Sequence, residues 1–343
     1  MEKNIKLSII IPVYNVETYL QDCIDSLVNQ TMQDIELIFV NDASQDGSLE
    51  ILLENEKKHP DMIRVINSEK NLMQGGARNL GIKAARAPYV GFMDSDDFVH
   101  PQMYEKLYQK AVGCDVAFGR YIEIPEETDV RMAESLSGTL LPDWGVLTEL
   151  ANKDLDAAQI QSIQTVTLCG VWCGVWKKSI IEENTIWFPE HLAYEDNYWT
   201  SLIRCYLHRI AFAMDAVYYH RLRKTGTVRT KNDPRHYHRI TVEQILMTEV
   251  EKRGLLERYH PVWEYIAVTR YCFGTYYHFH HHMDEPDITT LKTLIKDMKS
   301  KYPNWHKNKL VRENCSKKRR ALYRAIAIAP KLMSRFMTKL NLF

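Results

Sequence analysis

The first hundred residues alternate between short apolar runs and segments in which apolar residues recur every three or four positions. Runs of the first kind predict buried strands, at residues 7–12, 35–40, 62–66 and 89–93. Segments of the second kind predict helices with one apolar face, at residues 17–29, 48–58 and 74–86. This alternation of strands and helices is typical of an α/β fold, a Rossmann-like and mostly parallel sheet with helices on both faces.

Polar residues gather where three of these strands end, at residues 12–15, 41–44 and 94–97. Ligands of such sheets bind at the carboxyl ends of the strands, so we expect the three ends to form one site. A set of polar loops that simply face solvent is the alternative. No G-x-G-x-x-G follows a strand and no G-K-[ST] loop occurs, which argues against dinucleotide-binding and P-loop proteins.

The third strand end carries Asp94, Asp96 and Asp97 directly after an apolar run. Asp94 and Asp96 are two residues apart, so a nearly extended chain would project both carboxylates to one side. Mg²⁺ and Mn²⁺ are commonly held by one or two carboxylates, with substrate phosphates at other positions. The spacing therefore fits a metal and phosphate site. It also fits an acidic turn that leads into a helix near Pro101.

The composition is that of a globular protein large enough for two domains, or for one domain with a subdomain. Of its 343 residues, 45% are hydrophobic and 26% charged. We expect no transmembrane span and no signal peptide, because no apolar run reaches 18 residues and no small-residue cleavage site follows the first strand. The seven cysteines are scattered, which favours free thiols in a reducing compartment.

Charge is unevenly distributed, although the chain has 44 basic and 44 acidic residues. Residues 301–343 carry twelve Lys or Arg and one acidic residue, Glu313, so the preceding 300 residues have a net charge of −11. After Pro330, one helical face gathers the apolar residues Leu332, Met333, Phe336, Met337 and Leu340. A basic amphipathic helix of this kind favours an anionic membrane surface. Packing on the acidic body of the protein is the main alternative, and nucleic acid is disfavoured because no recognition motif is present.

Four segments in order resemble the family 2 glycosyltransferases, enzymes with a GT-A fold that bacteria use to build surface polysaccharides. The segments are Leu7 to Asn15, Val40 to Ser48, Ala77 to Ile82 and Phe92 to Asp97. The family often has Asn-x-Gly before its Ala-Arg-Asn, whereas this chain has Asn71-Leu72-Met73. We therefore expect the loop before residue 77 to differ from the family pattern.

The resemblance implies a nucleoside-diphosphate-sugar donor, most simply a UDP-sugar, and a bound Mn²⁺ or Mg²⁺. The residues that it places around the base, the ribose and the diphosphate are Pro12, Tyr14, Asp42, Arg78 and Asp94. A tyrosine ring can stack on a flat base, and a carboxylate can accept hydrogen bonds from a uracil imide or from ribose hydroxyls. Asp96 is the implied metal ligand, with Asp94 bridging to the ribose or the metal.

Two later segments also resemble the family. Residues 186–199 contain the pair Glu195-Asp196, which implies Asp196 as the catalytic base and Glu195 as the residue that orients it. An ordinary preference of acidic residues for the first turn of a helix explains the same pair. Residues 218–227 resemble a basic loop that closes over the diphosphate, with Arg221 and Arg223 as phosphate contacts and His220 as a further metal ligand or phosphate donor. A packed or solvated histidine is the alternative for His220.

Together these patterns predict a GT-A glycosyltransferase domain at residues 1–235, with a nucleotide-sugar half (1–120) and an acceptor half (121–235). A mainly helical region would follow at 236–343 and end in the basic tail 315–343. The expected activity is an inverting, metal-dependent transfer to a glycan or lipid-linked acceptor, on the cytoplasmic face of the inner membrane. An oligomer is compatible with the sequence. A sugar nucleotidyltransferase and a non-catalytic glycan-binding or scaffold protein are the alternatives.

Overall fold

The computed structural model describes residues 4–340 apart from 133–134, 167–169, 225 and 227–228, and of Val146 and residues 337–340 it gives the backbone alone. The chain divides into two compact units. The first comprises Met1–Ile160 and Thr167–Arg223, and the second comprises Gln161–Val166 and Lys224–Phe343. The predicted end of the first domain, residue 235, lies within the second unit.

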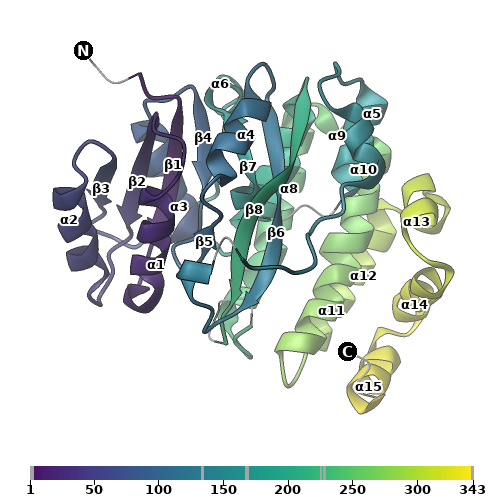
Figure 1. Ribbon diagram of the computed structural model, residues 1–343. Coiled ribbons are helices and arrows are strands. Elements are labelled where there is room, and N and C mark those ends of the chain that lie inside the picture. Colours follow the sequence, from purple (N-terminus) through teal and green to yellow (C-terminus); the bar gives the residue numbers. More distant parts are fainter. Residues whose placement is uncertain (1–3, 133–134, 167–169, 225, 227–228, 341–343) are drawn as a thin grey trace. The chain divides into compact units, whose positions relative to one another are not determined.

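The first unit begins with the predicted alternation of strands and helices (Figure 1). Its elements are β1 (Leu7–Val13), α1 (Glu17–Val28), β2 (Ile35–Asn41), α2 (Ser48–Lys58), β3 (Ile63–Asn67), α3 (Met73–Ala84) and β4 (Tyr89–Phe92). Every boundary lies within two residues of the prediction. β1 pairs in parallel with both β2 and β4, and β2 pairs in parallel with β3, as this connectivity requires.

The second half of the first unit extends this sheet. It contributes β5 (Phe98–Val99), α4 (Met103–Ala111), β6 (Val116–Pro125), β7 (Gly174–Lys177), α6 (Lys178–Glu183), α7 (Glu195–Ile203) and β8 (Ile210–Leu222). The resulting eight-stranded sheet has the order β3-β2-β1-β4-β7-β6-β8-β5. β6 and β8 pair in parallel, whereas the β4/β7, β6/β7 and β5/β8 pairs are antiparallel. The predicted mostly parallel sheet is therefore confirmed, and the structure adds the antiparallel pairs.

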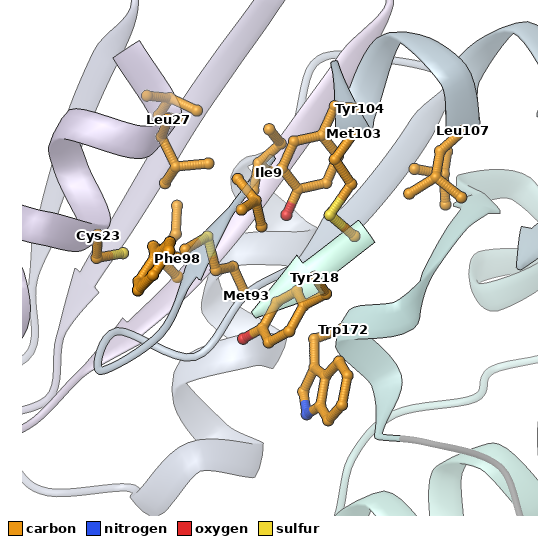
Figure 2. Packing of buried hydrophobic residues seen from close by; sticks show 14 of the residues in the cluster. Ile9, Cys23, Leu27, Met93, Phe98, Met103, Tyr104, Leu107, Trp172 and Tyr218 are labelled. Carbon is orange, nitrogen blue, oxygen red and sulfur yellow. The ribbon is translucent and has the colours of Figure 1, made fainter. Parts of the chain in front are cut away.

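Helices cover both faces of the sheet. Successive side chains of a strand point to opposite faces, and both sets are buried in β1 and β2. On one face, Ile9 belongs to a buried cluster with Leu27 of α1 and Tyr104 of α4 (Figure 2). On the other face, Ile10 meets α3 at Gly81, where an added Cβ would lie 2.3 Å from Ile10 Cγ2. Glycine at residue 81 thus allows α3 to approach the sheet closely, and α3 carries Arg78 of the predicted site.

The second unit is helical, as the sequence predicts. Its helices include α8 (His238–Lys252), α9 (Leu255–Arg258), α10 (His260–Ile266), α11 (Phe273–His282), α12 (Ile288–Lys301), α13 (Lys309–Asn314), α14 (Lys317–Ile328) and α15 (Pro330–Leu340), and α5 (Ala157–Thr165) runs from one unit into the other. A buried cluster joins α11, α12, α13 and α14, with Phe273 stacked on Tyr323 at 4.1 Å between ring centroids. Within residues 4–340, no described helix is long and apolar enough to span a membrane.

The cysteines agree with the expectation of free thiols where they can be placed. Six buried cysteines form no disulfide: Cys23, Cys114, Cys173, Cys205, Cys272 and Cys315. Cys169 lies outside the described residues.

Candidate active site

The ends of β1 and β2 are joined by side chains, as predicted for parallel neighbours. The Asn15 backbone N–H donates to Ser44 Oγ at 3.1 Å, and Asn15 Oδ1 accepts from the Gln45 N–H at 2.7 Å. Pro12 is buried within β1. Tyr14, directly after the end of β1, is 49% exposed. Tyr14 therefore presents its ring to solvent beside the two joined strand ends.

Asp42, the residue after β2, is 2% exposed and its carboxylate is held by the loop before α3. Its Oδ1 accepts a hydrogen bond from the Leu72 N–H at 2.7 Å. Burial raises the pKa of Asp42, and the backbone N–H groups of Leu72 and Met73 oppose that shift in part. Met73 has φ +59°, the left-handed conformation that glycine adopts most easily. Met73 thus supplies, without a glycine, the kind of turn that glycine makes easily.

The acidic segment after β4 contains three carboxylates with different surroundings. Asp97 is 1% exposed, and it accepts hydrogen bonds from the Tyr218 hydroxyl and the Arg221 N–H, both at 2.7 Å. Burial, together with Asp96 and Asp94, raises the pKa of Asp97 well above its usual range. Asp97 therefore ties the turn to β8, whereas Asp94 and Asp96 keep side chains that are 22% and 27% exposed.

Arg78 on α3 joins the acidic segment to α7. Its side chain is 3% exposed, and Nη2 contacts Asp94 Oδ1 at 2.8 Å while Nη1 is paired with Glu195 Oε1. Burial alone would lower the pKa of Arg78, but the two carboxylates outweigh burial and the pKa is raised. A buried guanidinium with two carboxylate partners is a charge that the fold compensates. Arg78 therefore fixes the ends of β4 and α7 relative to each other.

The pair Glu195-Asp196 forms the first turn of α7, where the preceding Tyr194 has φ +65°. Glu195 is 2% exposed, and burial raises its pKa to about 7, although Arg78 pulls the pKa down. Asp196 is less buried, and its Oδ1 accepts a hydrogen bond from the Asn197 N–H at 2.9 Å. The two neighbours thus differ, since Glu195 is enclosed with Arg78 and Asp196 is more accessible.

His220 on β8 lies in an aromatic stack. Tyr218 and His220 are two residues apart on one strand and so share a face. Trp172 stacks on Tyr218 with ring centroids 4.3 Å apart (Figure 2). The Trp172 ring also stacks on His220, with centroids 5.5 Å apart. His220 Nδ1 is buried and has no hydrogen-bond partner among the described residues. The stack fixes the plane of the imidazole.

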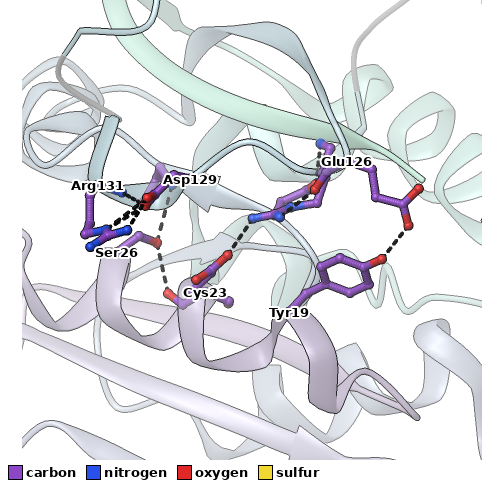
Figure 3. A network of polar contacts seen from close by, with 10 residues as sticks. Tyr19, Cys23, Ser26, Glu126, Asp129 and Arg131 are labelled. Carbon is purple, nitrogen blue, oxygen red and sulfur yellow. Dashed lines mark hydrogen bonds and ion pairs between the residues drawn. The ribbon is translucent and has the colours of Figure 1, made fainter.

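Arg221 and Arg223 have different environments, although both guanidinium groups lie over the ring of Tyr19. Arg221 is 5% exposed and contacts Asp22 Oδ2 at 2.9 Å and the Glu126 carbonyl at 2.8 Å. Arg223 is more accessible and contacts Asp96 Oδ2 at 2.8 Å. The Tyr19 hydroxyl donates to the Glu126 carboxylate (Figure 3), and this bond holds the ring under both arginines. Thr225 and Thr227 of the predicted basic loop lie outside the described residues.

Comparison with known proteins bears directly on this arrangement. The model of glycosyl transferase family 2 matches residues 8–182, about half of the chain. The uncharacterized glycosyltransferase YibD of Escherichia coli (strain K12) is 31% identical over 309 residues, 87% of this chain and 85% of that protein. The chain belongs to glycosyl transferase family 2. This membership confirms the resemblance drawn from the four sequence segments, and it favours glycosyl transfer over nucleotidyl transfer or a scaffold role.

Two further similarities concern parts of this family 2 glycosyltransferase or its fold. The poly(ribitol-phosphate) beta-glucosyltransferase of Bacillus spizizenii is 31% identical over 226 residues, which are 64% of this chain but 33% of that protein. The crystal structure of S. aureus TarS 1-349 in complex with UDP-GlcNAc has a TM-score of 0.72 at 19% identity, covering 98% of this chain and 91% of that one. At this identity the likeness concerns the fold, and it agrees with the predicted GT-A architecture.

The predicted metal ligands of this glycosyltransferase have free coordinating atoms. Asp94 and Asp96 each pair one carboxylate oxygen with an arginine. The second carboxylate oxygen of each, Asp94 Oδ2 and Asp96 Oδ1, receives no hydrogen bond from the described residues. His220 Nδ1 is also unpaired there. No group of three or more His, Cys, Asp or Glu side chains that could hold a metal occurs among the described residues. The predicted ligands Asp94, Asp96 and His220 therefore do not form one three-ligand group here, and the fit to a hard divalent cation depends on the two carboxylates, with substrate phosphate and water completing the shell.

Four residues of this site could not be identified from the sequence as we interpreted it. They are Tyr19, Glu126, Trp172 and Tyr218. The strand period gave one usable signal, because Tyr218 shares a face with His220. Trp172 and Glu126 carry no such signal, since the sheet brings them in from segments without a regular pattern.

Proposed function

We propose that this glycosyltransferase moves a sugar from a UDP-sugar to a hydroxyl group of a glycan or lipid-linked acceptor during the synthesis of a surface polysaccharide. The contact of Arg78 with both Asp94 and Glu195 carries the proposal. This contact brings the predicted donor side, at the end of β4, against the predicted acceptor side, at the start of α7. The similarity to a poly(ribitol-phosphate) beta-glucosyltransferase, and to TarS in complex with UDP-GlcNAc, supports this donor and acceptor class.

For the donor, we assign Pro12, Tyr14 and Asp42 to the base and ribose. The exposed ring of Tyr14 can stack on a planar base. The Asp42 carboxylate already accepts from the Leu72 N–H, and it has further acceptor capacity for an imide or a ribose hydroxyl. Its location between β2 and the loop before α3 supports a role in holding the nucleoside.

For the chemical step, we assign Asp196 as the base. The acceptor oxygen forms a bond to the anomeric carbon, and its proton passes to the Asp196 carboxylate. The bond from the anomeric carbon to the diphosphate breaks, and its electron pair leaves with UDP. Attack opposite the leaving group inverts the anomeric centre. Glu195 and Arg78 act as positioning residues, because they hold the first turn of α7 against the end of β4.

For the diphosphate, we assign Asp94, Asp96 and His220 as the residues that would hold Mn²⁺ or Mg²⁺. When bound, the cation would neutralise charge on the departing diphosphate. Arg223 is the better placed of the two predicted arginines, because its guanidinium is half-buried next to Asp96, whereas that of Arg221 is enclosed by Asp22 and Glu126. A planar guanidinium suits a phosphate oxygen pair.

The proposal can be tested with the Asp196→Asn variant after a screen of nucleotide sugars for hydrolysis in the presence of Mn²⁺. Loss of the base should reduce transfer by roughly a hundredfold or more, while donor binding measured by calorimetry stays the same. Asp61→Asn, at an exposed residue, is the matched control and should transfer normally. Normal turnover by Asp196→Asn would remove this residue as the base, and a protein that hydrolyses no nucleotide sugar would contradict the proposed donor class.

A further inference from the structure

The last two helices of the second unit expose large apolar side chains. Ile328 and Leu332 are 81% and 66% exposed, the highest values for large apolar residues in the described chain, and Phe336 is 50% exposed. Ile328 ends α14, and Leu332 and Phe336 lie one turn apart on α15. We call these three residues the apolar ridge.

The opposite side of α15 is packed onto its own unit. Met333 packs against the buried cluster of the unit, and Ser334, which is 5% exposed, contacts His280 Nε2 at 2.7 Å. The Tyr276 hydroxyl also donates to the Pro330 carbonyl at 2.8 Å. The sequence predicts Met333 on one face with Leu332 and Phe336, but the structure divides them. The orientation of α15 is thereby fixed, with the apolar ridge left in solvent. The side chains of Met337, Lys339 and Leu340 lie outside the described residues.

Basic side chains accompany the apolar ridge. Five of them are exposed, and none of the five forms an ion pair with any residue that the structure describes: Lys317, Lys318, Arg324, Lys331 and Arg335. No acidic residue occurs in the sequence after Glu313. The surface of α14 and α15 therefore combines exposed aliphatic and aromatic side chains with uncompensated positive charge.

We propose that the apolar ridge and these five basic residues dock on an anionic lipid surface. Apolar side chains enter the boundary between headgroups and acyl chains, and Lys and Arg contact the headgroups. A second copy of the chain is a poorer occupant, since it would bring five more positive charges against the first five. Nucleic acid would satisfy the charges but would leave Ile328 and Leu332 without an apolar partner. The proposal is independent of the donor and the acceptor.

Vesicle binding by the full-length protein tests this proposal. Binding to phosphatidylcholine vesicles that contain phosphatidylglycerol should exceed binding to pure phosphatidylcholine, and it should weaken in about 1 M salt, where the screening length falls to about 3 Å. Leu332→Ser with Phe336→Ser should weaken binding roughly tenfold or more. Lys331→Gln with Arg335→Gln should weaken it by about thirtyfold at low salt, the effect expected for two basic residues.

Two matched controls are available in the same unit. Lys292→Gln with Lys296→Gln removes two exposed charges with the same spacing on α12, and Ile245→Ser removes an exposed apolar residue on α8. Both variants should bind vesicles like the unchanged protein. Equal binding to neutral and anionic vesicles, or unchanged binding by both ridge and charge variants, would overturn the proposal. A dimer that dissociates in the Leu332 and Phe336 variant, without vesicle binding by either protein, would overturn it in favour of a second copy.

Discussion

At the scale of single residues, the site depends on charges whose partners are other residues of the site. Arg78 is shared by Asp94 and Glu195, and Arg223 is paired with Asp96. The predicted roles of Asp94 and Asp96 thus involve carboxylates that already have a cationic neighbour. A ligand that binds these carboxylates would share them with the arginines, and the charges of the site lead to three predictions.

The first prediction is that activity depends on pH through Glu195. Burial raises the pKa of Glu195 to about 7. As the pH falls through about 7, Glu195 takes up a proton and Arg78 loses one negative partner. We expect kcat to fall on this acid side, and Glu195→Gln to lack that step while turning over roughly tenfold to a hundredfold more slowly at pH 8. Glu123→Gln, at an exposed residue of β6, should keep the wild-type profile.

The same shift gives a second prediction, for stability. Folding raises the pKa of Glu195 above its ordinary value of 4.5, so this group contributes stability below about pH 4.5 that is lost as the pH rises through about 7. The free energy of unfolding of the wild-type protein, relative to Glu195→Gln, should therefore decrease between pH 4 and pH 8. Denaturant titrations at several pH values measure this difference. A difference that is independent of pH would contradict the assignment of the shift to Glu195.

The third prediction concerns Arg223, which competes with a divalent cation for Asp96. A partly exposed ion pair contributes about 0.2–1 kcal/mol, and a cation that displaces Arg223 from Asp96 must offset this free energy. Arg223→Gln should therefore bind Mn²⁺ a few-fold more tightly in the absence of donor, as measured by electron paramagnetic resonance, whereas Asp96→Ala should bind it more weakly. Arg229→Gln, at an exposed basic residue nearby in sequence, is the control. Weaker Mn²⁺ binding by Arg223→Gln would contradict this competition.

At the scale of elements, the start of α3 departs from the family pattern in sequence but keeps a glycine-like backbone. Met73 has φ +59°, which costs an L-residue about 1–2 kcal/mol, whereas glycine adopts it freely and loses about 0.5–1 kcal/mol in chain entropy. Met73→Gly should thus raise the free energy of unfolding by about 0.5 kcal/mol. Gln74→Gly, at the next residue of the helix, should lower it by about 1 kcal/mol. Urea titrations measure both changes. If Met73→Gly is less stable than the wild-type protein, the contacts of the methionine side chain contribute more free energy than the positive φ costs.

The elements that could be predicted from the sequence are those with a regular period. Leu20, Ile24 and Leu27 marked α1, and the run of apolar residues from Leu7 marked β1, because burial on one or both faces leaves a repeating pattern. The segments between β6 and β7 have no such period, so Trp172 could not be assigned to the site. The role of Asp97 was also unpredictable, since a turn residue and a buried acceptor of two hydrogen bonds have the same sequence signature.

At the scale of the whole molecule, the sequence predicted which segments meet but not how they are linked. The coincidence of polar strand ends pointed to Asp42 and Asp94, and the resemblance pointed to Glu195 and Asp196. The contact of Arg78 with both groups required the fold, because it joins residues 117 positions apart. The division of the chain after Arg223 falls at the start of a polar stretch that contains Gly226 and Pro234, and the predicted boundary, residue 235, falls at its end.

The double pairing of Arg78 has a consequence for the order in which the chain can complete its fold. The family match ends at residue 182, before Glu195, and β8 follows later still. A chain synthesised from its N-terminus exposes Arg78 well before one of its two partners exists. Removing one partner of a buried charge costs about 3–5 kcal/mol, so we expect Arg78 to be held less firmly until α7 is available to pair with it. We therefore expect the segment that the family model matches, residues 8–182, to lack by itself one of the two ion pairs that hold Arg78 in the proposed donor site.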